Sequence, residues 1–164
     1  MQEVTSINEA IKVMSVHMAN LFYYLTKEVL ADFGDPAKES FKRAIVEFGH
    51  ARGRAIREKV LADGLPLTLE NLDRYYDIPL DQGWQTQREY SDNVRNNVTT
   101  SCTQALVWKE KDWEEVGHIY CLVDFAIREG YSDNIEFQAI KNILQGDDYC
   151  QSRTVYKDLS RKGL

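Results

Sequence analysis

Residues 112–131 read DWEEVGHIYCLVDFAIREGY, and this stretch determines how the rest of the chain is organised. Its apolar residues recur at helical spacing and form one continuous stripe, made of Trp113, Val116, Tyr120, Val123 and Ile127. Leu122, Phe125 and Ala126 add apolar surface beside that stripe. A helix that is apolar on several sides is normally buried, so the sequence predicts a central helix inside the domain.

Three chemically active side chains interrupt this apolar helix. His118, Cys121 and Asp124 follow one another at steps of three residues, which places them along one side of the helix. A carboxylate in a buried helix costs several kcal/mol unless it is paired or hydrogen-bonded. Asp124 is therefore the residue for which we most expect a functional reason.

The composition is that of an ordinary globular protein, and 164 residues suffice for one domain with its own core. The net charge of −6, with acids and bases mixed along the chain, argues against nucleic acid or an anionic membrane as a partner. No apolar run approaches the roughly 20 residues that cross a bilayer, and the N-terminus lacks the pattern of a signal peptide. Three cysteines without a disulfide framework fit a reducing compartment, so we expect a cytoplasmic protein.

The N-terminal part, residues 6–63, is predicted to form two long helices. The second begins at Asp35-Pro36, since proline suits the first helical position, and it ends at Gly64. The first ends before Gly34, and its apolar residues recur every three or four positions: Ile7, Ile11, Met14, Met18, Leu21, Leu25 and Phe33. The predicted core face of the second consists of Phe41, Ala44, Ile45, Phe48, Ala55 and Val60.

Two glycines four residues apart, Gly49 and Gly53, lie inside the second helix. Each costs about 1 kcal/mol relative to alanine, and together they leave a smooth notch that another backbone or a ligand can approach. Close packing is the preferred interpretation. If a ligand approaches instead, Arg52 and Arg54 can hold a carboxylate, because a guanidinium group binds carboxylates bidentately. The remaining alternative is a solvated basic face.

The pattern from residue 87 to residue 102 is that of a single strand. One face of this strand would combine apolar and polar side chains, among them Tyr90, Val94, Asn96, Val98 and Cys102. Such a face suits a sheet that lines a partly polar cavity, which makes Asn96 a candidate for substrate binding. An edge strand with a solvated face fits equally.

The predicted fold class is α+β. Residues 65–86 connect the helical part to the rest and contain a short helix between Thr68 and Tyr76. Residues 87–156 hold the sheet and the central helix. Residues 135–144 fit either a helix or a strand, and a strand is the preferred interpretation because residues 145–148 resemble a hairpin connection to a strand over 149–156. Two long N-terminal helices and the central helix would then pack on a small antiparallel sheet within one domain, residues 1–164.

Three interpretations of the cysteines, His118 and Asp124 stay open from spacing alone. In the first, Cys121 is a nucleophile assisted by Asp124 or His118, because a thiol attacks well only with a lowered pKa or an adjacent base. In the second, His118 and Cys121 bind zinc with Cys150 or Cys102. In the third, all are core residues, because free cysteine is among the most buried residue types.

A resemblance to a known family adds information. Cys102, the segment YCLVD (residues 120–124) and the segment GDDYC (residues 146–150) follow one another as in the L-2-amino-thiazoline-4-carboxylic acid hydrolases. Residues 48–54 also resemble the glycine- and arginine-containing helical stretch of that family. The terminal hairpin is more loosely similar to vinyl-reductase-type small-ligand domains. Residues 151–154, QSRT, depart from the aromatic strand that is usual after the last cysteine, which affects the expected substrate more than the fold.

The resemblance implies hydrolytic opening of a cyclic isothiourea, the 2-amino-thiazoline ring, to an N-carbamoyl-cysteine. It implies Cys121 as nucleophile, Asp124 as base or ring-nitrogen partner, and Cys150 as a second thiol of the catalytic pocket. The candidates for substrate binding are Cys102, His118, Arg52, Arg54 and Asn96. This chemistry requires no cofactor, and zinc is not the preferred interpretation.

Two alternatives to this hydrolase stay open. A non-catalytic domain would bind a small organic acid or amine without turnover, and a zinc-dependent hydrolase would hold about one zinc ion per chain. A small molecule is the expected partner in each case. The apolar stripe of the first helix and the many aromatic residues also leave room for a homodimer interface.

Overall fold

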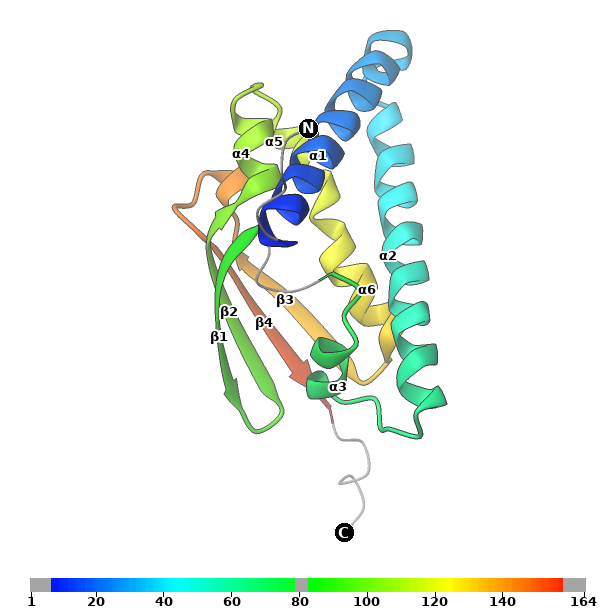
Figure 1. Cartoon of the computed structure of the whole chain (residues 1–164). Coiled ribbons are helices and arrows are strands. Elements are labelled where there is room, and N and C mark those ends of the chain that lie inside the picture. The colour runs from blue at the N-terminus through cyan, green and yellow to red at the C-terminus, as the bar shows by residue number, and fades with distance from the viewer. Residues whose placement is uncertain (1–6, 79–82, 158–164) are drawn as a thin grey trace.

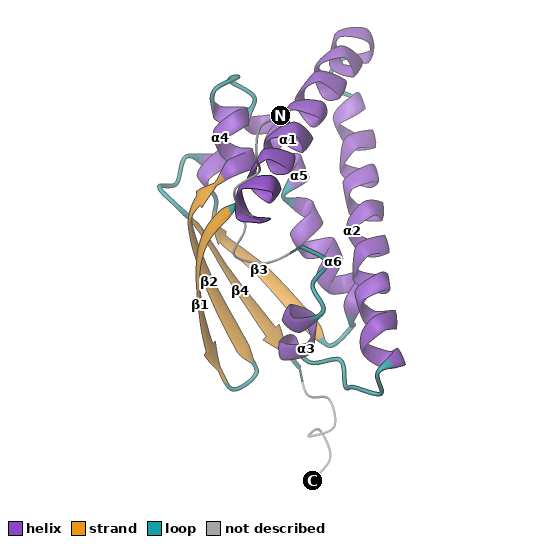
Figure 2. Ribbon diagram, in the orientation of Figure 1, coloured by secondary structure: helices purple, strands orange, loops and turns teal. Residues whose placement is uncertain are grey.

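The computed structural model describes residues 7–78 and 83–157 and consists of helices packed on one face of a four-stranded antiparallel sheet (Figures 1 and 2). This confirms the predicted α+β class. The elements are α1 (Ile7–Phe33), α2 (Ala37–Ala62), α3 (Leu69–Arg74), β1 (Trp84–Ser91), β2 (Val94–Cys102), α4 (Thr103–Lys109), α5 (Glu114–Tyr120), α6 (Leu122–Tyr131), β3 (Ile135–Lys141), the 3₁₀ turn η1 (Ile143–Gln145) and β4 (Cys150–Tyr156). The strand order is β1-β2-β4-β3.

The first two strands correct the prediction of a single strand over residues 87–102. β1 and β2 are antiparallel neighbours that turn at Asp92-Asn93, so that Ser91 pairs with Val94. Asp92 has a positive φ of 47°, a conformation that aspartate tolerates better than most residues. Because this turn reverses the chain, Thr86 and Arg88 of β1 share a face with the odd-numbered residues 95, 97 and 99 of β2. A register shift between Gln85 and Thr86 then places Cys102 opposite Trp84. The periodicity of the sequence did not reveal which side chains of the two strands share a face.

The predicted connection over residues 65–86 is shorter than expected, because β1 already begins at Trp84. Its short helix is confirmed as α3, which Thr68 caps by accepting a hydrogen bond from the backbone N–H of Asn71 at 3.2 Å. Residue 6 of the predicted helical part and residues 79–82 of the connection lie outside the described residues.

The predicted terminal hairpin is confirmed. β3 and β4 pair antiparallel, and β4 also pairs with β2 in the interior of the sheet. β3 ends at Lys141, before the end of the predicted strand, because Asn142 caps the 3₁₀ turn η1. Gly146 follows with φ of 95°, which glycine adopts without steric cost. This connection returns the chain to the sheet at Cys150.

The central helix is present, but it is divided into α5 and α6 at Cys121. Around the division the backbone makes hydrogen bonds of the tighter i→i−3 kind: Cys121 N–H to His118 O at 3.0 Å, and Asp124 N–H to Cys121 O at 3.2 Å. Figure 1 shows α6 lying between the sheet and α2. The prediction of one continuous helix is therefore corrected at Cys121.

The glycines of α2 let this helix approach α6 closely. A Cβ atom on Gly49 would lie 2.5 Å from the Cβ of Ala126, and one on Gly53 would lie 2.2 Å from the carbonyl oxygen of Ile127. From the other side, a Cβ on Gly130 of α6 would lie 2.5 Å from the carbonyl oxygen of His50. Close helix packing, the preferred interpretation of the notch, is confirmed.

The predicted helix α1 buries small and polar side chains instead of its apolar stripe. Ser15, Ala19 and Thr26 are buried, whereas most of the stripe is exposed to solvent: Ile7, Met14, Met18, Leu21, Leu25 and Phe33. Among the described residues, no helix is both long and apolar enough to cross a membrane. The homodimer stays a prediction.

Candidate functional site

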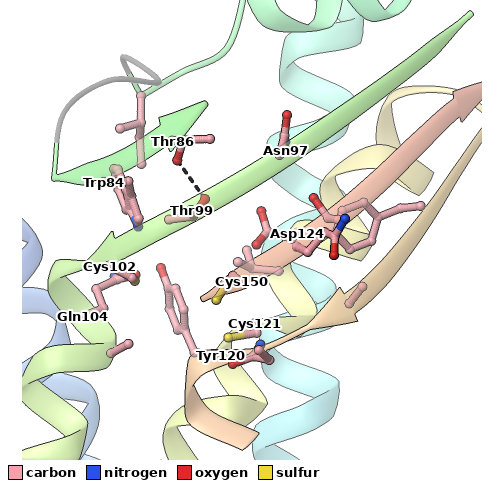
Figure 3. Close-up of a pocket in the computed structure, with 18 of the residues that line it drawn as sticks. Trp84, Thr86, Asn97, Thr99, Cys102, Gln104, Tyr120, Cys121, Asp124 and Cys150 are labelled. Carbon is pink, nitrogen blue, oxygen red and sulfur yellow. Dashed lines mark hydrogen bonds between the residues drawn. The ribbon is translucent and has the colours of Figure 1, made fainter. Parts of the chain in front are cut away.

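A cavity of about 230 Å³ lies between the inner face of the sheet and helices α1, α4, α5 and α6. Its volume is slightly below the range of about 300–1,000 Å³ that is usual for small-molecule sites. The described lining includes all three cysteines, and Figure 3 shows their side chains around one space with Asp124, Tyr120 and Gln104. The arrangement is suited to a compact ligand.

Three different parts of the fold supply the cysteines. Cys102 ends β2, Cys121 lies between α5 and α6, and Cys150 begins β4, opposite Thr99 of β2. All three are free thiols. The fold thus brings together Cys102, Cys121 and Cys150, which the sequence separates by up to 48 positions. Their gathering around one cavity meets the first geometric requirement of a thiol-based site.

Burial shapes the acidity of these thiols. It raises the pKa of Cys121 to about 12; Asp124 adds to the rise, and a hydrogen bond with Asn142 opposes it. Burial also raises the pKa of Cys150, whose sulfur accepts a hydrogen bond from the Ile143 N–H at 3.4 Å. Cys121 is thus a neutral thiol at pH 7, so its nucleophilic attack requires a base or a nearby cation.

The environment of Cys102 is different, because several donors face its sulfur. Burial raises the pKa of Cys102, but hydrogen bonds from the backbone of Ala105 and Gln104 and from the Trp84 side chain oppose that rise. These donors stabilise negative charge on the Cys102 sulfur. Spacing in the sequence gave no reason to expect such a difference between the cysteines.

Asp124 has the partner that its position required. Its Oδ1 atom lies 3.3 Å from Nη1 of Arg128, one turn later on α6, and the same Nη1 donates to the Asp124 carbonyl oxygen. The Arg128 side chain is only 7% exposed, whereas that of Asp124 is 50% exposed. The Arg128 guanidinium also lies over the ring of Phe137 on β3, 4.3 Å from its centroid. The carboxylate is therefore half-solvated at the cavity wall, and the buried charge is that of arginine.

A second arginine, Arg95 of β2, is buried at the sheet side of the cavity, and the sequence reasoning missed it. It pairs with Asp73 of α3, and its Nη2 lies 3.4 Å from Oγ1 of Thr154. Asp73 also accepts a hydrogen bond from the Tyr90 hydroxyl at 2.5 Å. The turn at Asp92-Asn93, once recognised, would have revealed Arg95, because it places odd-numbered residues of β2 on the inner face.

Of the other candidates from the sequence, Arg52 lines this cavity, whereas Arg54, Asn96 and His118 do not. Arg52 lines it but is engaged by Asp77 through Nε at 2.8 Å and Nη2 at 2.6 Å. Arg54 is exposed and does not line the cavity, and Asn96 lies on the outer face of the sheet, because its neighbours Arg95 and Asn97 point inward. His118 is half-buried outside the lining, and burial lowers its pKa.

The residues of the zinc interpretation are also not assembled as a metal site. Within residues 7–78 and 83–157, no three histidine, cysteine, aspartate or glutamate side chains are grouped so that they could hold a metal ion. His118 does not face the cavity in which Cys121, Cys150 and Cys102 meet. The proposed ligand set is therefore not brought together.

Two comparisons place this fold and site among known proteins. The structure resembles trafficking protein particle complex subunit 3 from Naegleria fowleri, solved covalently bound to palmitic acid, with a TM-score of 0.52 and 19% identity over 90% of this chain and 97% of that one. At this identity the likeness shows the fold alone. No curated protein sequence matches the chain. The family model of the L-2-amino-thiazoline-4-carboxylic acid hydrolases matches residues 14–154, which include every cavity residue discussed above, and the chain therefore belongs to that family.

Proposed function

We propose that this protein hydrolyses a small cyclic molecule of the 2-amino-thiazoline-4-carboxylate type inside the cavity. The observation that carries the proposal is the meeting of three free thiols and the Asp124 carboxylate in one cavity of about 230 Å³. Membership of the family supports the same class of substrate. Free thiols fit a reducing compartment, so we place the reaction in the cytoplasm.

The proposed reaction begins with attack of the Cys121 sulfur on the ring carbon that is bonded to nitrogen and sulfur. Asp124 accepts the thiol proton and returns it to the ring sulfur, which leaves as the carbon–sulfur bond of the ring breaks. The product of this half is an isothiourea linked to Cys121. Water then adds to the same carbon, the bond to Cys121 breaks, and N-carbamoyl-cysteine is released. One water molecule is consumed in total.

The high pKa of Cys121 fits this sequence of events if the substrate itself activates the thiol. An amidine-like ring that carries a proton is a cation, and a cation within a few ångströms lowers the pKa of a thiol. The half-exposed Asp124 lies one turn away and can accept the proton. Cys150 and Cys102 then act as lining groups, with Cys102 facing hydrogen-bond donors.

Mass spectrometry of the product tests the proposal. Purified protein is incubated with 2-amino-thiazoline-4-carboxylate, and N-carbamoyl-cysteine is measured together with the new thiol. We expect turnover by the wild type, and loss of at least about a hundredfold in Cys121→Ser and in Asp124→Asn. Asp133→Asn makes the same change as Asp124→Asn at an exposed position outside the cavity and should keep full activity. Full activity in Cys121→Ser and Asp124→Asn would contradict the assigned roles.

A second candidate function is ligand binding without turnover. The observation that favours it is the raised pKa of Cys121, which leaves the thiol unactivated in the empty cavity. In that case the ring compound binds at about one per chain, is recovered unchanged, and protects Cys121 from alkylation. Calorimetry with product analysis on the same sample separates the two functions.

A further inference from the structure

We infer that Arg95, Arg128 and Asn97 form the recognition site for the carboxylate and an adjacent N–H group of the ligand. The identity of the ligand's ring rests on the proposed function. The assignment of a negatively charged ligand group to these residues does not. It assigns the carboxylate to different arginines from those that the sequence suggested, Arg52 and Arg54.

The first observation is that both arginines are buried with an unused donor. Arg95 is 2% and Arg128 is 6% exposed. Each uses its Nη atoms for a protein partner, Asp73 or Asp124, while its Nε–H meets no acceptor among the described residues. A buried N–H without an acceptor has lost its hydrogen bond to water and gained none in return, so proteins rarely retain one without a reason.

The second observation is a buried acceptor near Arg95. Oδ1 of Asn97 has no donor among the described residues, and Asn97 lines the same cavity. Arg95 and Asn97 are two residues apart on β2, so their side chains rise from the same face of the sheet. Two N–H donors and one carbonyl acceptor are therefore left unpaired around one space.

The register of the sheet places the two arginines close together. Arg95 pairs with Thr154, and Thr154 pairs with Phe137, so the three form one row across β2, β4 and β3. The Nη2 atom of Arg95 approaches Oγ1 of Thr154, and the guanidinium group of Arg128 stacks over the ring of Phe137. Neighbouring strands are roughly 5 Å apart, so Thr154 of β4, which the Arg95 Nη2 atom approaches, lies one strand away from Phe137 of β3, whose ring the Arg128 guanidinium covers.

The third observation is the charge of the cavity. Its described lining holds five bases and two acids, although the whole chain carries a net charge of −6: Arg52, Arg88, Arg95, Arg128 and Lys141 against Asp73 and Asp124. Arg52, Arg95 and Arg128 are paired with Asp77, Asp73 and Asp124, whereas Lys141 has no ion pair among the described residues and leaves a positive charge at the lining. A positively charged enclosed site selects an anion.

These observations together define the ligand class. A carboxylate can accept hydrogen bonds from both Nε–H groups, while an N–H one or two bonds away donates to Oδ1 of Asn97. A small organic acid with a ring or chain nitrogen next to its carboxylate satisfies all three atoms. The neutral carboxamide of the same ring lacks the charge that the arginines require.

Calorimetric titration of two matched ligands tests the inference. The probes are 2-amino-thiazoline-4-carboxylate and its carboxamide, and turnover of each is measured separately. We expect the wild type to bind the acid about ten- to a hundredfold more tightly than the amide, the effect of one or two charge-assisted hydrogen bonds. In Arg95→Lys and Arg128→Lys, which keep the charge but lose Nε, this preference should fall to within about threefold.

Matched variants exclude a general loss of structure. Arg153→Lys makes the same change on the exposed outer side of β4 and should keep the full preference. Asn97→Leu removes the acceptor and should weaken the acid and the amide alike, because both carry the ring N–H. Thermal melting confirms that each variant is folded at the titration temperature.

The outcomes separate this inference from the proposed function. Acid-selective binding without turnover contradicts the hydrolase and supports the carboxylate site. Turnover of acid and amide at equal efficiency, or an unchanged preference in both lysine variants, overturns the carboxylate site. Failure of the wild type to bind the acid overturns it as well.

Discussion

Gly53 of α2 and Ile127 of α6 approach so closely that a Cβ atom on Gly53 would lie 2.2 Å from the carbonyl oxygen of Ile127. The two helices therefore meet backbone to backbone. α6 carries Asp124 and Arg128, so this contact sets the position of two charged groups in the cavity wall.

Gly53→Ala should destabilise the fold by about 1–3 kcal/mol, because the added methyl group meets backbone atoms that cannot rotate away. Chemical denaturation measures the loss in free energy of unfolding. The adjacent exposed change Arg54→Ala should stay within about 0.5 kcal/mol of the wild type. An equally stable Gly53→Ala would mean that α2 and α6 are not in this close contact.

Asp73→Asn should destabilise the protein by about 3–5 kcal/mol, because it leaves the Arg95 charge buried without its acid. Replacing both partners, Asp73→Leu with Arg95→Met, should recover most of that loss, since the buried charge disappears. Denaturation of the wild type, Asp73→Leu, Arg95→Met and the double variant gives the coupling energy. Additive single effects would argue against a buried ion pair.

Cys121 should react slowly with iodoacetamide at pH 8. A pKa of about 12 leaves about a thousandth of the thiolate that an ordinary cysteine with a pKa of 9.0 provides. Site-resolved mass spectrometry follows the alkylation of each cysteine with time. Rapid labelling of Cys121 in the protein without ligand would show that burial does not control its reactivity.

The same raised pKa predicts a loss of stability in alkali. The folded protein holds the Cys121 proton to about pH 12, whereas the unfolded chain releases it above about pH 9, so the wild type loses up to about 1.4 kcal/mol per pH unit between these values through this group. Cys121→Ala lacks that contribution. The difference in free energy of unfolding between the two proteins, measured at pH 8 and 10, should therefore shrink toward pH 10; a constant difference contradicts the prediction.

Thr26→Val should cost about 1–3 kcal/mol, although it preserves the size of the side chain. Oγ1 of Thr26 accepts the indole N–H of Trp113 at 3.0 Å, and valine leaves that donor without its partner. Thr100→Val, at an exposed position of β2, is the matched control. Equal melting temperatures for both variants would mean that this hydrogen bond does not join α1 to the central helix.

Local patterns account for the elements that the sequence predicted correctly. Helical spacing, the stops at Gly34 and Gly64 and the cap at Thr68 act within a few residues, so α1, α2 and α3 could be located without a structure. The notch of Gly49 and Gly53 also indicated close packing in advance, because glycine inside a helix has a cost that some contact must offset.

The β1–β2 turn is a feature that local sequence patterns could not predict. The residues from 87 to 102 alternate without interruption, and nothing in the alternation marks the point where Asp92 reverses the chain. The reversal moved Asn96 outward and Arg95 and Asn97 inward. Arg95 was missed for this reason, while Arg54, chosen for its sequence neighbourhood, lies outside the cavity.

By itself the sequence determined the fold class, the long helices, the terminal hairpin and the family, because each depends on local spacing or on short ordered segments. Only the tertiary structure decided which charges and thiols share a cavity, how far burial shifts the acidity of Cys121, and which guanidinium groups keep a free donor. The reason is physical: acidity and hydrogen-bond satisfaction depend on solvent exclusion and on partners distant in the chain, and neither is encoded in the spacing of neighbouring residues.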